Sequence, residues 1–246
     1  MKADPITEAI MAETEMIVLE GPFAGTLLTN DVSWGTGDLG SKLLGMYEQE
    51  LHPTLVKFAA RSYGAVVDVG CAEGYYAVGL AKLFPGTPVY AYDSNQKAIE
   101  ITGKTAALNN VRDRLCTGGR CGPDELLDVI KNNGRSLIMC DCEGYEEKLF
   151  SAPELVGALR SSDLIIECHD FINPRTTAEL VRIFSGTHRI ELVYSGARNP
   201  NKYGFLSQFR DRDRWNVVSE NRPCLMHWMI LESKTRKAPS PELVGP

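Results

Sequence analysis

The chain has 246 residues, a formal net charge of −6 at pH 7 and 43% hydrophobic residues. This length can bury one good hydrophobic core with room for a small cap, and the composition is that of an ordinary soluble globular protein. The acidic balance indicates no broad basic face for nucleic acid. No apolar run approaches the roughly 18 residues needed to cross a bilayer. We therefore expect neither a nucleic-acid partner nor a membrane partner.

The N-terminus and the cysteines indicate the compartment. No basic stretch followed by an apolar segment opens the chain, so no signal peptide is evident. None of the seven cysteines forms a Cys-x-x-Cys pair, and most lie in apolar, strand-like runs. Reduced, buried thiols in a cytoplasmic protein fit this usage best. We expect a cytoplasmic protein without a structural zinc site.

Residues 1–60 precede the first strong strand pattern. Apolar stretches at 16–19 and 26–28 flank a loop with glycine and proline, which predicts a hairpin or loop. The stretch 43–60 is typical of a helix, although Pro53 interrupts it and leaves two shorter helices open. This region is expected to be a cap or lid over the substrate, or else a helical layer that only covers the sheet edge.

From residue 65 onward, apolar strand patterns alternate with helical patterns, which predicts a parallel sheet covered on both faces. The strands are expected at 65–69, 89–92, 114–117, 137–141, 164–169 and 190–194, and the helices at 75–84, 95–109, 123–132, 145–159 and 175–185. Right-handed crossovers then place every loop that follows a strand on one edge, where ligands bind.

The first of these strands ends in an acid and a loop of small residues, Asp68-Val69-Gly70-Cys71-Ala72-Glu73-Gly74-Tyr75. Glycines at 70 and 74 allow a cofactor to lie against the backbone, and the helix start near Tyr75 suits a carboxylate. Asp68 supplies the negative charge that an ammonium or sulfonium group favours. S-adenosylmethionine carries all three groups, whereas Asp68 and Glu73 would repel the pyrophosphate of NAD. NAD and an ordinary turn without a ligand stay open as weaker alternatives.

Further residues of the predicted cofactor site follow the next strands. Asp93 lies 25 residues after Asp68, where a carboxylate accepts hydrogen bonds from ribose hydroxyls, and a helix cap is its alternative role. Glycines near 118 would let the chain pass close to an adenine ring. The predicted cofactor-binding residues are Asp68, Gly70, Cys71, Ala72, Glu73, Gly74, Tyr75, Asp93, Ser94, Gly118 and Asp141.

The predicted catalytic residues, His169 and Asp141, follow the fourth and fifth strands. Asp141 opens an acid-rich stretch, and it could position the methionine amine, bind a metal or orient the acceptor. His169 could take a proton from a hydroxyl acceptor, because its ordinary pKa near 6.5 suits that task. Alternatively, Asp141, His169 and Asp170 could hold a divalent cation, or His169 could be structural. We assign no metal ligand.

After Tyr194, a polar loop leads to a last strand at 224–231 with no helix between, and such a strand is most simply antiparallel to its neighbour. The predicted fold class is therefore α/β: a Rossmann-like methyltransferase fold with a mostly parallel, seven-stranded, doubly wound sheet, an antiparallel last strand and an N-terminal cap. The expected domains are the cap at 1–60, the S-adenosylmethionine-binding methyltransferase domain at 61–235 and a flexible tail at 236–246.

Four stretches over about residues 43–195 carry a resemblance to a known family. They are Gly45–Glu48, Asp68–Tyr76, Asp141-Cys142-Glu143-Gly144-Tyr145-Glu146 and Ile165–Asp170. In these stretches the sequence resembles the FkbM-type branch of S-adenosylmethionine-dependent methyltransferases. The resemblance implies a Rossmann-like fold and methyl transfer, commonly to a hydroxyl oxygen of a sugar or natural product. It also implies that Asp68, Gly70 and Gly74 line the methionine end of the cofactor and Asp93 its ribose.

The predicted function is O-methylation of a small molecule with S-adenosyl-L-methionine as co-substrate. One alternative is N-methylation of a small amine or peptide, for which a base matters less. Another, from a different class, is a non-catalytic partner subunit that binds the cofactor without turnover. An NAD-dependent oxidoreductase is a third. The expected partner is a small-molecule acceptor, and a homo-oligomer stays open.

Overall fold

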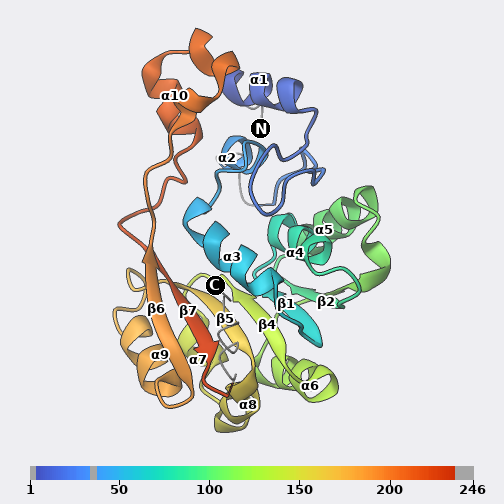
Figure 1. The fold of residues 1–246 in the computed structure, drawn as a ribbon, viewed down its shortest axis with the longest axis vertical. Coiled ribbons are helices and arrows are strands. Elements are labelled where there is room, and N and C mark those ends of the chain that lie inside the picture. The colour runs from blue at the N-terminus through green and yellow to red at the C-terminus, as the bar shows by residue number, and fades with distance from the viewer. Residues whose placement is uncertain (1–3, 34–37, 236–246) are drawn as a thin grey trace, which may run out of the picture.

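The computed structural model describes residues 4–33 and 38–235, and its seven strands form one sheet in the order β3-β2-β1-β4-β5-β7-β6 (Figure 1). β7 runs antiparallel to both of its neighbours, while the other paired strands are parallel. The strands are β1 (Ala65–Val69), β2 (Val89–Tyr92), β3 (Leu115–Gly118), β4 (Ser136–Cys140), β5 (Asp163–Cys168), β6 (His188–Tyr194) and β7 (His227–Ser233). This topology confirms the predicted fold class.

Helices cover the two faces of the sheet and enclose two hydrophobic cores. Alternate residues of a strand point to opposite faces, so Val66 packs in one core while Val67 packs in the other. One face carries α3 (His52–Ala59), α4 (Tyr75–Leu83) and α5 (Gln96–Leu108). The other carries α6 (Pro123–Asn133), α7 (Glu146–Leu149), α8 (Pro153–Ala158) and α9 (Thr176–Phe184).

The N-terminal segment packs on the α4 side of the sheet. Ile10 and Leu43 are fully buried in the same core as Val78. α1 (Pro5–Thr14) contacts both α2 (Leu39–Leu43) and α10 (Asp211–Val217), and the three helices lie together at the end of the molecule far from β4 (Figure 1). An antiparallel bridge between Ile17 and Leu27 forms at the predicted hairpin. The predicted tail at 236–246 lies outside the described residues.

Prolines divide two regions that sequence patterns presented as long helices. The single helix expected at 145–159 is wrong: the chain forms α7 and α8, because Pro153 begins a new helix and Ala152 before it is extended. The stretch 43–60 likewise contains the end of α2, a turn and then α3, with Pro53 in the first turn of α3. Short 3-10 segments complete the description: η1 (Gln49–Leu51), η2 (Arg112–Arg114), η3 (Leu159–Ser161), η4 (Pro200–Lys202) and η5 (Gly204–Gln208).

Within the described residues, no helix is both long and apolar enough to span a bilayer. All seven cysteines are free, and Cys71, Cys121, Cys140 and Cys168 are buried.

Candidate active site

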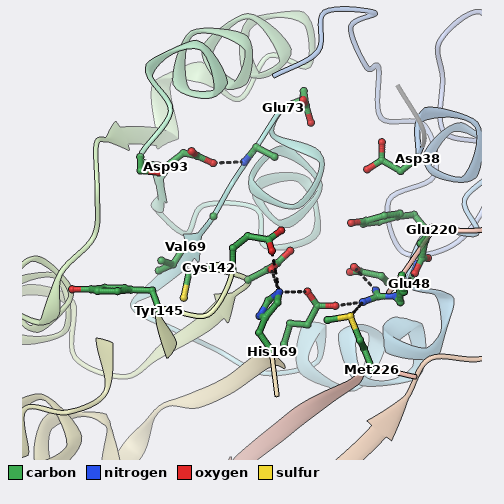
Figure 2. Close-up of a pocket in the computed structure, with 18 of the residues that line it drawn as sticks. Asp38, Glu48, Val69, Glu73, Asp93, Cys142, Tyr145, His169, Glu220 and Met226 are labelled. Carbon is green, nitrogen blue, oxygen red and sulfur yellow. Dashed lines mark hydrogen bonds and ion pairs between the residues drawn. The ribbon is translucent and has the colours of Figure 1, made fainter. Parts of the chain in front are cut away.

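A cavity of about 710 Å³ opens at the carboxyl ends of the parallel strands, on both sides of the boundary between β1 and β4. The strand order reverses there, which is where open α/β sheets bind ligands. One half of the cavity wall comes from the loops after β1, β2 and β3. The other half comes from the loops after β4 and β5, the segment 38–48 and the segment 220–226. In Figure 2, Asp93 and Glu73 lie toward one end of the cavity, and His169 and Met226 toward the other.

Gly70 fixes how closely the β1 loop approaches the end of β4. Its φ is +91°, and a Cβ at this position would lie 1.6 Å from the carbonyl oxygen of Asp141. Backbone amides of Gly70 and Cys71 donate to the carbonyl oxygen of Tyr92 at 2.8 and 3.0 Å, so the loop is also tied to β2. The loops of both halves of the cavity therefore meet at Gly70.

Asp93 connects the loop after β2 to the loop after β1. Its Oδ2 accepts a hydrogen bond from the amide of Ala72 at 2.9 Å, and its Oδ1 accepts one from the amide of Asn95 at 2.7 Å. Ala72 itself has a left-handed φ of +43°. Each carboxylate oxygen has a second lone pair, so Asp93, which lines the cavity, retains acceptors for a ligand.

Seven of the predicted site residues line this one cavity, and five lie behind its wall. The lining members are Gly70, Ala72, Glu73, Asp93, Ser94, Asp141 and His169. Behind the wall, Asp68 is buried and burial beside Asp93 raises its pKa to about 7. Three of the remaining four support the loop after β1 from behind: Cys71 contacts Thr102, Gly74 caps α4 in a left-handed conformation, and Tyr75 packs edge-on against Phe23. The fourth, Gly118 at the end of β3, leaves space for the ring of Tyr92.

His169 is buried at the end of β5 and is surrounded by carboxylates. Its Nδ1 lies 2.7 Å from Oε1 of the fully buried Glu146. Its Nε2 faces the cavity, 3.3 Å from Oε2 of Glu167, 3.4 Å from Oε2 of Glu143 and 3.5 Å from Oδ1 of Asp141. Burial lowers the pKa of His169, but the bond to Glu146 and the charges of the neighbouring carboxylates outweigh it, so the net direction is upward.

Arg222 joins the acidic residues of the cavity's other side. Its guanidinium pairs with Glu167, with Glu48 at 2.9 Å and with Glu220 at 2.7 Å. Burial and the nearby charges of Glu167 and Glu220 raise the pKa of Glu48 well above its ordinary value. This network brings together residues that are up to 174 positions apart in the sequence.

The cavity as a whole is acidic. Its wall includes the carboxylates of Asp38, Glu48, Glu73, Asp93, Asp141, Glu143, Glu167 and Glu220, against the cations of Lys42, Arg120 and Arg222 together with His169. Burial and the charge of Glu167 raise the pKa of Asp141 well above its ordinary value. Such a surface attracts cationic groups and repels phosphate-rich ligands.

The sequence predicted no role at the site for Lys42, Glu48, Glu220 and Arg222, which come from the segments at 38–48 and 220–226. Glu48 ends one of the stretches that carried the family resemblance, the other three belong to no motif, and only the folded chain brings all four to the sheet edge. The aromatic side chain of Tyr47 is part of the wall and also packs against the core.

Comparisons with known proteins bear on the class of protein. Residues 28–133 match the family model described as the methyltransferase small domain. A stretch of 88 residues is 32% identical to ribosomal protein L11 methyltransferase of Porphyromonas gingivalis, covering 34% of this chain and 30% of that protein. A stretch of 53 residues is 47% identical to a probable cobalt-precorrin-6B C(15)-methyltransferase (decarboxylating) of Pyrobaculum aerophilum, covering 21% of this chain and 27% of that protein. The chain thus spans less than a third of the length of these curated relatives.

Among solved structures, the N-terminal domain of human METTL16 in complex with S-adenosylhomocysteine has a similar fold. The TM-score is 0.52 at 15% identity, and the match covers 92% of this chain and 82% of that one. At this identity the likeness concerns the fold. Together with the family model and the sequence relatives, it confirms the predicted class of protein, an S-adenosylmethionine-dependent methyltransferase, and the predicted cofactor.

The expected membership of the FkbM-type branch is wrong, because the family model that matches is the methyltransferase small domain. One of the four stretches that carried the resemblance, 141–146, has a structural explanation of its own. Glu143 and Gly144 turn the chain with left-handed φ values of +53° and +89°. The carboxylate of Glu146 then accepts a hydrogen bond from the amide of Gly144 at 3.1 Å and holds His169.

Proposed function

We propose that this methyltransferase moves the methyl group of S-adenosylmethionine to a hydroxyl oxygen of a small molecule. The observation that supports this most is the position of His169, which is buried, held by Glu146 and turned with Nε2 into the cavity beside Asp141. A sulfonium methyl is already activated, so alignment and exclusion of water are the main tasks of the protein. A group that removes the hydroxyl proton is needed in addition when the acceptor is a weakly acidic alcohol.

In this proposal the donor occupies the half of the cavity formed by the loops after β1, β2 and β3. Gly70, Ala72, Glu73, Asp93 and Ser94 lie along that half. The ribose is expected to bind Asp93, and the positive charges of the donor suit the acidic wall. Asp68 is buried behind the loop after β1 and is not part of the cavity wall. In this proposal it affects the donor only by supporting that loop.

The acceptor is expected in the other half, between the ends of β4 and β5 and the segments 38–48 and 220–226. We assign the N-terminal region 1–60 the role of a cap on this side, because Lys42, Tyr47 and Glu48 contribute to the wall. The reaction forms a bond between the acceptor oxygen and the methyl carbon and breaks the carbon–sulfur bond. The bonding electrons pass to sulfur, and the hydroxyl proton leaves through the cluster around His169.

A second candidate is methyl transfer to an amine. The surplus of carboxylates over cations in the wall attracts an amine in its ammonium form. The two candidates differ in their need for His169, because an amine that has given up its ammonium proton to solvent before the attack needs no general base in the transition state.

The test measures S-adenosylhomocysteine release from the wild-type chain and His169→Gln with panels of small alcohols and small amines. For a hydroxyl acceptor we expect kcat to fall about 100-fold or more in His169→Gln, the scale of general acid–base catalysis, while the affinity for S-adenosylhomocysteine is kept. Retention of most of the rate would favour the amine reaction. Cofactor binding without turnover on any acceptor would favour a non-catalytic partner subunit and would overturn the proposal.

A further inference from the structure

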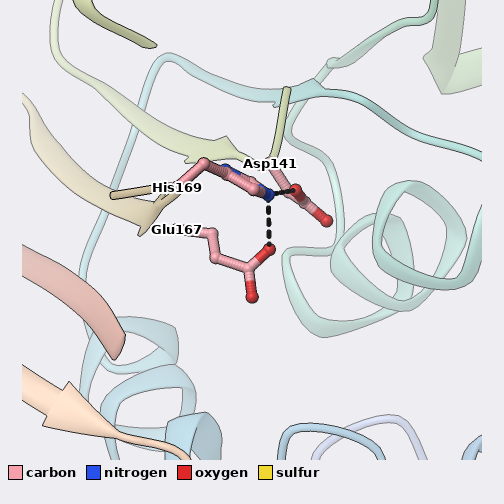
Figure 3. A group of neighbouring side chains, drawn as sticks. All are labelled: Asp141, Glu167 and His169. Carbon is pink, nitrogen blue, oxygen red and sulfur yellow. Dashed lines mark ion pairs between the residues drawn. The ribbon is translucent and has the colours of Figure 1, made fainter. Parts of the chain in front are cut away.

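Three carboxylate oxygens gather around one nitrogen of His169 without making an ordinary hydrogen bond to it. The distances from Nε2 to Glu167, Glu143 and Asp141 are 3.3, 3.4 and 3.5 Å. Hydrogen bonds from nitrogen to oxygen are usually about 2.7–3.2 Å long, and the contact of the same ring with Glu146 on the opposite nitrogen, at 2.7 Å, has that length. Figure 3 shows two of these groups, Asp141 and Glu167, each with one carboxylate oxygen facing Nε2 of His169.

The spacing has the size of a coordination shell. Bonds from zinc to histidine nitrogen or carboxylate oxygen are about 2.0–2.2 Å, which gives about 3.3–3.6 Å between neighbouring ligands of a tetrahedron. The contacts of Nε2 with Glu167 and Asp141 fall in this range. One ligand atom from each of Asp141, Glu167 and His169 can be chosen so that all lie within 4.8 Å of one another.

The residues behind these three groups supply an independent observation. Metal-binding histidines typically donate their other ring N–H to a carboxylate, which fixes the tautomer and the orientation of the ring. Glu146 is fully buried and occupies that position on Nδ1. A proton on Nδ1 leaves the lone pair of Nε2 facing the cavity. Glu167 is held in turn by Arg222 through Oε1, so its Oε2 is the oxygen that faces His169.

We propose that Asp141, Glu167 and His169 bind one divalent transition-metal ion, of the Zn²⁺ or Mn²⁺ class, in the wall of the cavity. One nitrogen and two carboxylate oxygens suit Zn²⁺, which is commonly bound by histidine and carboxylate, and the two carboxylates also suit Mn²⁺, whereas Mg²⁺ prefers an all-oxygen shell. Three protein ligands leave a coordination position open, as in catalytic metal sites. Glu143, whose side chain is 63% exposed, lies 3.4 Å from Nε2 at the rim and is able to exchange protons with solvent.

The role of this ion rests on the proposed function. A hydroxyl acceptor bound at the open position would lose its proton more readily, because the cation stabilises the oxyanion. The proton would pass to Glu143, the oxygen lone pair would form the new bond to the methyl carbon, and the electrons of the carbon–sulfur bond would remain on sulfur. His169 would then bind the ion and would not itself accept the proton.

The test is calorimetric titration of the chelator-treated, full-length chain with MnCl₂ and, separately, ZnSO₄. We expect one equivalent to bind, with a loss of about 100-fold or more in affinity for Asp141→Asn and His169→Gln. Glu146→Gln should weaken binding by about 10- to 100-fold, the usual effect of removing a partner of a metal-bound histidine. The matched control is Glu147→Gln, because Glu147 is the next residue and pairs with Asn173 and Arg175 outside the cluster. The affinity of Glu147→Gln for each metal ion should stay within threefold of the wild type.

Urea unfolding and circular dichroism, measured on each variant, establish that the fold is intact. The proposal is overturned if neither ion binds stoichiometrically, if His169→Gln binds as well as the wild type, or if Glu146→Gln and Glu147→Gln behave alike. Full activity of the stripped protein on a hydroxyl acceptor would also overturn it and leave the proposed function standing. Stoichiometric metal binding without methylation of any hydroxyl would overturn the proposed function and leave the metal site standing.

Discussion

Replacing Gly70 by alanine tests the contact between the β1 loop and the end of β4. A non-glycine residue in the left-handed region costs roughly 1–2 kcal/mol, and Gly70 has φ +91°. The added Cβ would also lie 1.6 Å from the carbonyl oxygen of Asp141, so backbone has to move. Overpacking of this kind adds about 1–3 kcal/mol. We therefore expect Gly70→Ala to lower the free energy of unfolding by about 2–5 kcal/mol.

Gly86 provides the matched control. Its φ is +84°, nearly that of Gly70, but nothing lies within 4 Å of the position of its Cβ. Gly86→Ala should therefore show the conformational cost alone, about 1–2 kcal/mol. The difference between the two variants isolates the overlap with Asp141.

Urea unfolding and calorimetric titration with S-adenosylhomocysteine measure both effects. Because Gly70 lines the cavity, a displaced loop should weaken ligand binding about 100-fold, which corresponds to about 3 kcal/mol. Gly86→Ala should bind within twofold of the wild type. Equal stability and equal affinity of Gly70→Ala and Gly86→Ala would show that the loop tolerates a side chain at its closest approach to β4. The overlap with Asp141 would then not limit position 70 to glycine.

Three further changes test the buried charges. Asp68→Asn should be more stable than the wild type, and its advantage in unfolding free energy should be about 3 kcal/mol larger at pH 8 than at pH 5. The reason is that the pKa of Asp68 in the folded protein, about 7, exceeds the unfolded value, so the stability of the wild type falls between the two values as pH rises. An equal advantage at both pH values in urea unfolding would contradict this. Asp163→Ala should cost about 3–5 kcal/mol, since it strands Arg61 and Arg135. The pKa of Asp163 is lowered in the folded protein. The loss of stability, measured by urea unfolding, should therefore shrink as the pH falls through this lowered pKa. A loss that does not depend on pH would speak against the ion pairs. Arg222→Met should likewise lose about 3–5 kcal/mol at pH 8, less in acid where the stranded carboxylates protonate; an unchanged melting temperature would rule out the described network.

The fold was predictable because its signals are local. Each parallel strand is a short apolar run followed by a helical pattern. The expectation that no helix precedes the last strand is wrong, because α10 lies between β6 and β7, but the predicted antiparallel direction of β7 is confirmed. The boundary at Pro153 was also visible in the sequence, but the helical pattern on both sides obscured it. The helix α10 was not predicted, because its alternating charges hide the apolar contact of Val217 with the core.

The candidate site was predictable only where it follows a strand end. Gly70, Asp93, Asp141 and His169 come directly after strands, and parallel strands bring these positions to one edge. The pairing of Glu48 with Arg222 could not be found, because it depends on how two irregular segments fold over the sheet. Glu48 ends a stretch that carried the family resemblance, but that stretch gave it no role, and Arg222 has no local pattern. The role of Glu146 was hidden for another reason: an acid in the first turn of a helix is common for electrostatic reasons alone.

Calorimetric titration with S-adenosylhomocysteine tests whether this cavity binds the methyl donor. We expect one ligand per chain in the wild type. We expect a loss of about tenfold or more in affinity for Asp93→Ala, since hydrogen bonds to a charged group contribute about 1.5–3 kcal/mol, and no change for Asp113→Ala, whose side chain is exposed outside the cavity. Absence of binding to the wild type, or equal affinity of the two variants, would show that the donor does not bind in this cavity as described.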